Sequence, residues 1–136
     1  MILSTLDIKS VKHLHDTELF YLLFSIFCAI FGAVYEWFSH EVYAYSMLYA
    51  FMIPLIGGAL PTLLLIRAQK TPPVQLESEI YRCGIITITV GTLVRGVLII
   101  YGTSSPLCSI YPIVGLTFCA LGVIIYGIRR CRVKAL

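Results

Sequence analysis

The sequence predicts an all-α integral membrane protein, a bundle of four transmembrane helices in which the second helix is kinked or broken. Hydrophobic residues make up 59% and charged residues 12% of the 136 residues, whereas soluble domains average about 45–50% and about 25%. Four apolar stretches each approach the roughly 20 residues that cross a bilayer core; they span about 19–39, 42–66, 80–101 and 110–128. The length allows one domain, so residues 1–136 are predicted to form a single transmembrane unit.

The first span follows a segment of mixed polar and apolar residues, 1–18, which we expect to lie on the membrane surface as an interfacial helix. Within the span, aromatic residues recur at spacings of three and four and therefore share one helix face; they are Phe20, Phe24, Phe27, Phe31, Tyr35 and Phe38. The opposite face carries Ser25, Ala29, Gly32 and Glu36. We expect lipid to contact the aromatic face and other helices to contact the small one.

The second span is interrupted by Pro54, Gly57, Gly58 and Pro61. Each proline lacks an N–H and cannot bond the carbonyl four residues back, here those of Ala50 and Gly57. The pattern predicts a kink or a break, with one of these carbonyls unpaired within its own helix. Broken helices form substrate sites in many transporters, although a proline kink between packed helices is also tolerated without any such role.

The third and fourth spans each have a face of small residues. Gly84 and Gly91 share one face of the third span with Arg95, and Gly115, Cys119 and Gly122 share one face of the fourth. Helices in lipid pack closely through such faces because no hydrophobic drive holds them together. We therefore expect both spans to pack tightly against neighbours.

The basic residues predict the orientation. Nine of them fall on one side of a four-span arrangement, and neither connection on the other side contains any; they are Lys9, Lys12, Arg67, Lys70, Arg82, Arg129, Arg130, Arg132 and Lys134. The positive-inside rule then places both termini in the cytoplasm. The predicted location is a bacterial cell membrane, with several spans and the N- and C-termini inside.

Two ionisable residues within the spans, Glu36 and Arg95, are the candidate site. Such groups cost on the order of 2.5–3.5 kcal/mol on insertion scales, so they normally face a partner or a cavity. Counting the rise along each helix places both in the outer half of the membrane. We expect them to meet and, with His40, to line a polar pocket that opens outward; the alternative is an ion pair that only pins two helices.

The sequence gives little indication of catalysis, metal binding or nucleic-acid binding. No hydrolase, kinase, dinucleotide, P-loop or zinc-protease motif is present, and the five cysteines form no C-x-x-C pair. His13 and His15 fall on different faces of a helix, which disfavours a metal site. The basic residues are too dispersed for nucleic acid. We therefore expect no enzyme activity, no cofactor and no metal.

Three runs carry a resemblance: Phe38-Ser39-His40-Glu41-Val42-Tyr43, Pro54-Leu55-Ile56-Gly57-Gly58 and Gly102-Thr103-Ser104-Ser105-Pro106. Together they resemble small four-span membrane proteins of Firmicutes bacteria, which implies the fold and no particular activity. The expected function is a small binding or transport unit that self-associates in the lipid bilayer. The alternative is an accessory subunit of a larger membrane complex, without a substrate of its own. A transporter would use the carbonyls freed in the second span, whereas an accessory protein would cover them with its own helices.

Overall fold

The computed structural model describes residues 2–39, 44–68 and 73–136. The elements are α1 (Ile2–Phe38), α2 (Tyr45–Leu48), α3 (Met52–Pro54), the π-helical turn η1 (Leu55–Ala59), α4 (Leu60–Arg67), α5 (Gln75–Ile100), the 3₁₀ turn η2 (Pro106–Ser109) and α6 (Ile110–Ala135). These described ranges contain no strand. Four helical segments are long and apolar enough to cross a membrane: Ile8–Phe38, Tyr45–Arg67, Gln75–Ile100 and Pro106–Ala135. The predicted fold class is confirmed.

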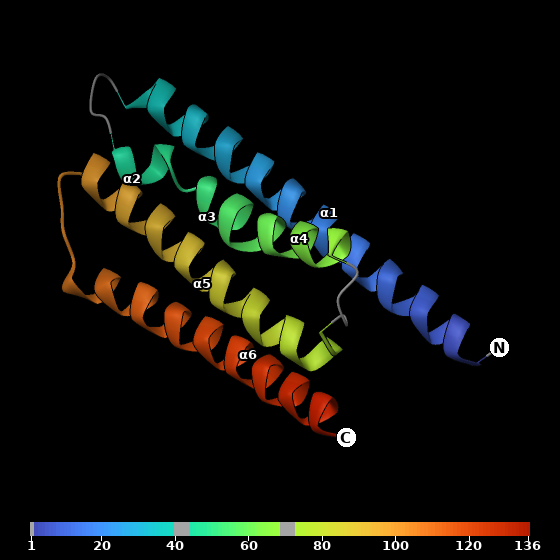
Figure 1. Ribbon diagram of the computed structural model, residues 1–136. Coiled ribbons are helices and arrows are strands. Elements are labelled where there is room, and N and C mark those ends of the chain that lie inside the picture. The colour runs from blue at the N-terminus through green and yellow to red at the C-terminus, as the bar shows by residue number, and fades with distance from the viewer. Residues whose placement is uncertain (1, 40–43, 69–72) are drawn as a thin grey trace.

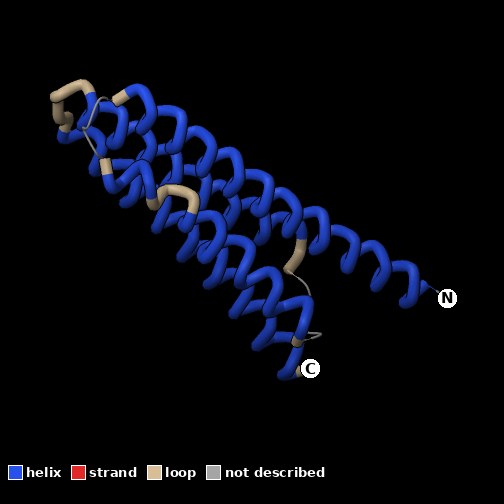
Figure 2. Tube along the Cα trace, turned by 90° about the horizontal axis from the view of Figure 1, so that it is seen from above, coloured by secondary structure: helices blue, strands red, loops and turns tan. Residues whose placement is uncertain are grey.

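The first span and the segment before it form one helix. α1 runs for 37 residues without a break at residue 18, so it is about 55 Å long and exceeds the roughly 30 Å bilayer core. Ile8 and Val11 are exposed, and Leu14 is the first buried side chain described in the helix. The beginning of α1 therefore projects beyond its neighbours (Figures 1 and 2), instead of forming a separate helix as expected.

The face of α1 that packs against the other helices differs in part from the predicted small face. Its buried residues recur at spacings of three and four: Leu14, Thr17, Tyr21, Ser25, Cys28 and Gly32. Ser25 and Gly32 were expected there, whereas Ala29 is exposed. Tyr21 is only 1% exposed and forms a core cluster with Ala59 and Ile85. This tyrosine links α1 to the second span and to α5.

The second span is kinked, as the prolines predicted. Pro61 cannot bond Gly57, and the preceding amide, Leu60 N–H, bonds the carbonyl of Leu55, five residues back, so the turn is π-helical. The Gly57 carbonyl accepts a hydrogen bond of 2.6 Å from the Tyr81 hydroxyl of α5. The Ala50 carbonyl accepts the Ile53 N–H at 3.3 Å, so this carbonyl has a partner within the second span. Both carbonyls thus have partners from this chain.

The third and fourth spans make the closest helix contact. A Cβ atom added to Gly84 would lie 2.7 Å from the Gly115 carbonyl oxygen, and one added to Gly115 would lie 2.8 Å from that of Gly84. Further along, a Cβ atom on Gly91 would lie 2.2 Å from the Tyr111 Cβ. Only glycine allows this approach of the two backbones, so these small faces pack as expected.

The spans lie side by side in the order α1, second span, α5 and α6 (Figure 1). We call the end that carries both termini the basic end, because Arg67 ends α4 there and the last turns of α6 carry Arg129, Arg130, Arg132 and Lys134. Towards this end α4 packs against α1, whereas α5 packs against α6. The two pairs of helices diverge, and this divergence positions the cavity described below.

The orientation remains a prediction that single-cysteine labelling can test. Cys108 is buried in η2, so we expect an exposed substitute in the preceding connection, Ser104→Cys, to report on that side of the membrane. A membrane-impermeant thiol reagent applied to intact cells should label the Ser104→Cys variant of a chain without other cysteines. A chain that retains only the exposed Cys131 should be labelled only after the cells have been permeabilised. The reverse pattern would invert the predicted topology.

Candidate functional site

A partly enclosed cavity of about 160 Å³ lies at the basic end, where α4 and α5 diverge. All four spans contribute to its wall. The apolar lining includes Leu14, Pro61, Leu65, Pro73 and Val123, and the polar lining includes Thr17, Thr62, Glu77 and Ser78. Three tyrosines, Tyr21, Tyr81 and Tyr126, also line it. A mostly apolar wall with a few convergent polar groups is typical of small-molecule sites.

Glu77 is the buried charge of this cavity. It lies in the first turn of α5, where its carboxylate accepts the Val74 N–H at 3.0 Å and so caps the helix. Arg129 of α6 donates to the same carboxylate through Nε at 2.8 Å and Nη2 at 3.0 Å. The Glu77 side chain is 4% exposed and the Arg129 side chain 32%. This bidentate pair holds the end of α6 against the beginning of α5.

Tyr81 joins the cavity to the π-helical turn. It follows Glu77 by four residues and therefore lies on the same face of α5. Its ring lines the cavity while its hydroxyl holds the Gly57 carbonyl. The next residue, Gly58, packs against the Tyr21 ring, and a Cβ atom there would lie 2.2 Å from Tyr21 Cδ1. The broken part of the second span thus packs directly on two tyrosines that line the cavity.

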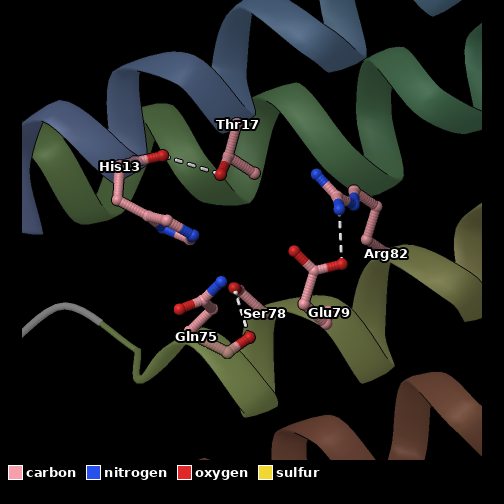
Figure 3. A network of polar contacts seen from close by, with 6 residues as sticks. All are labelled: His13, Thr17, Gln75, Ser78, Glu79 and Arg82. Carbon is pink, nitrogen blue, oxygen red and sulfur yellow. Dashed lines mark hydrogen bonds and ion pairs between the residues drawn. The ribbon is translucent and has the colours of Figure 1, made fainter.

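A polar rim, formed by His13, Gln75, Glu79 and Arg82, adjoins the cavity between α1 and α5. Figure 3 shows these side chains around Thr17 and Ser78, which line the cavity itself. Arg82 pairs with Glu79 and also stacks over the Phe20 ring, with 5.0 Å between the guanidinium carbon and the ring centroid. The cavity therefore combines an apolar interior with a charged edge.

The structure does not bring the predicted site residues together. Glu36 borders a space of only about 10 Å³, beside Met47 of α2 and Ile100 of α5, which is room for about one water. Arg95 is exposed on α5. The ion pairs between described residues join Arg82 to Glu79 and Arg129 to Glu77, so the expected contact between Glu36 and Arg95 is not formed. His40 lies outside the described residues, and a role of these residues in binding stays a prediction.

Glu77, Tyr81 and Arg129 were missed as site residues for identifiable reasons. The third span was predicted to begin at about residue 80, which leaves Glu77 outside it, but α5 begins earlier, at Gln75. A local signal existed, since an acidic residue three positions after a helix start can cap the first turn. No local signal reveals the pairing of Glu77 with Arg129 or of Tyr81 with Gly57, because the partners are 52 and 24 residues apart.

Neither metal chemistry nor a relative adds to this site. Across residues 2–39, 44–68 and 73–136, no three His, Cys, Asp or Glu side chains are grouped so that they could hold a metal ion. Comparison of the chain with protein-family models, with curated proteins and with solved structures finds no match.

Proposed function

We propose that this multi-pass membrane protein binds a small molecule in the cavity at the basic end. The observation that carries the proposal is the cavity itself, about 160 Å³ in volume and lined by all four spans. An apolar cavity of about 150 Å³ is known to hold benzene, so the space suits a compact molecule of about that size. The site lies at the end opposite the pocket expected near Glu36.

The state of the second span supports binding more than transport. A transporter was expected to offer its freed carbonyls to a substrate, yet the Gly57 carbonyl is held by Tyr81 and the Gly58 carbonyl by Thr62, at 2.6 Å and 2.9 Å. The cavity ends against the π-helical turn, where Gly58 is packed on Tyr21. These contacts favour a closed pocket over a path across the membrane.

The proposal is tested by filling the cavity. Val123 lines it but is 58% exposed in this chain, so a larger side chain there can be accommodated. We expect a small molecule that co-purifies with the wild-type protein in mild detergent, detected by mass spectrometry, to be lost from Val123→Phe. Ile124→Phe is the matched control, because Ile124 is similarly exposed and does not line the cavity. Equal recovery from the wild type and Val123→Phe would contradict the proposal.

The second candidate is the accessory subunit, and the same covered carbonyls favour it. A chain that satisfies its own broken span needs no substrate there, and α6 packs on α5 while its remaining apolar side chains, such as Ile113, Leu116 and Val123, are exposed. Association with a second copy or with a larger membrane protein would cover that surface. Native mass spectrometry of the complex extracted from membranes separates the two candidates, because an accessory subunit should be recovered with a stoichiometric protein partner and no small molecule.

A further inference from the structure

We propose that the ligand of this cavity is a small organic ammonium ion, a compact apolar body that carries a positively charged N–H donor. The inference rests on the proposed binding function and adds the chemical class of the ligand. It follows from the directions of the hydrogen bonds around the cavity.

Four hydroxyl groups that line the cavity already use their protons in hydrogen bonds within the protein. Each donates to a backbone carbonyl, which can only accept: Thr17 to His13 at 2.7 Å, Thr62 to Gly58 at 2.9 Å, Ser78 to Gln75 at 2.9 Å and Tyr81 to Gly57 at 2.6 Å. A hydroxyl has one proton and two lone pairs. What these four groups can still offer a ligand is therefore lone pairs alone, so a ligand that bonds to any of them must supply the donor.

The charged group of the cavity points to the same class. An ionised carboxylate accepts at about four lone-pair positions, and Glu77 uses three of them for Arg129 Nε, Arg129 Nη2 and the Val74 N–H. One position is left to accept a further donor. Arg129 does not itself line the cavity, so an anionic ligand would meet mainly lone pairs and a carboxylate, which repel it.

Three aromatic rings in the cavity wall also favour a cation. Tyr21, Tyr81 and Tyr126 line the cavity, and the face of an aromatic ring attracts cations, ammonium groups included. Tyr126 already shows this preference, since the Arg129 guanidinium carbon lies 5.8 Å from the centre of its ring. The Tyr21 hydroxyl has one proton and two lone pairs, so it does not remove the excess of acceptors.

The test compares how tightly four probes of nearly equal size bind to the 136-residue chain in lipid nanodiscs. The probes are benzylammonium, benzyl alcohol, toluene and benzoate. Binding is followed by the NMR signals of ¹³C-labelled tyrosine rings, with empty nanodiscs correcting for partition into lipid. We expect benzylammonium to bind about tenfold more tightly than benzyl alcohol, since charge-assisted hydrogen bonds are about twice as strong as neutral ones. Benzoate should bind least.

The outcomes separate the two proposals. Equal or tighter binding of toluene, benzyl alcohol or benzoate would overturn the ammonium class and leave a binding cavity in place. If no probe shifts the tyrosine signals of the wild type beyond those of Val123→Phe, the proposed function itself is wrong.

Two hydroxyl variants sharpen the assignment. Ser78→Ala and Thr62→Val each remove one acceptor from the cavity and should weaken benzylammonium several-fold while leaving toluene unchanged. Thr117→Val is the matched control, because the Thr117 hydroxyl donates to the Ile113 carbonyl at 2.8 Å in the same way but does not line the cavity. An equal loss of benzylammonium binding in Thr117→Val would overturn the role of the cavity hydroxyls.

Discussion

Replacing Arg129 with methionine should lower the free energy of unfolding by about 3–5 kcal/mol, the range found when one partner of a buried ion pair is removed. The reason is that the Glu77 carboxylate, 4% exposed, would be left buried without its guanidinium partner. Glu77→Ala should have a smaller effect, about 1–3 kcal/mol, because Arg129 is 32% exposed and its guanidinium can turn towards water. The measurement is an SDS titration followed by circular dichroism.

Two controls define what the pair contributes. Arg132→Met removes an exposed arginine from the same end of α6 and should change stability by less than about 0.5 kcal/mol. Glu79→Ala breaks the more exposed pair with Arg82 and should cost no more than about 1 kcal/mol. The double variant Glu77→Ala, Arg129→Met should be more stable than Arg129→Met alone, since the unpaired carboxylate is gone. If Arg129→Met matches Arg132→Met, the pair does not support the fold.

Gly84→Val should separate α6 from α5 and cost about 3 kcal/mol, the upper end of the range for overpacking. The added Cβ atom would lie 2.5 Å from the Cys119 Sγ and 2.7 Å from the Gly115 carbonyl oxygen, and a backbone oxygen cannot move aside as a flexible side chain can. Gly127→Val is the matched control on α6, because a Cβ atom at Gly127 meets nothing within 4 Å. Equal stabilities of the two variants in an SDS titration would show that the helices are not held by this close contact.

The sequence was most informative where a residue type leaves no alternative. Proline has no N–H, so Pro61 predicted the break in the second span wherever the other helices lay. Glycine has no side chain, so Gly84 and Gly115 predicted that each of the last two spans packs closely against a neighbour. Neither prediction depends on knowing which helix is the neighbour. Four apolar stretches of sufficient length likewise predicted the number of spans.

The residues that meet at a site depend on how each helix is rotated about its axis and on which helices are its neighbours. The sequence specifies neither. Counting residues along the spans gave the heights of Glu36 and Arg95 in the membrane, but it did not give the direction in which each side chain leaves its helix. Arg95 follows Gly91 by four residues, and Gly91 packs against Tyr111 of α6. Glu36 instead lies beside α2, which packs against both α1 and α5. Similar heights therefore did not produce a contact, and the pair that does form joins Glu77 to Arg129.

The glycine contact between α5 and α6 also bears on the order in which the chain is assembled during synthesis. These spans are consecutive, and the 3₁₀ turn η2 lies in their short connection, so closing their hairpin requires only a small loop. Contacts of short sequence separation form early because little chain entropy is lost. The bond between Glu77 and Arg129 spans 52 residues and involves the last turns of α6, which are translated after the other three spans. The cavity wall is therefore completed only after α6 has been translated.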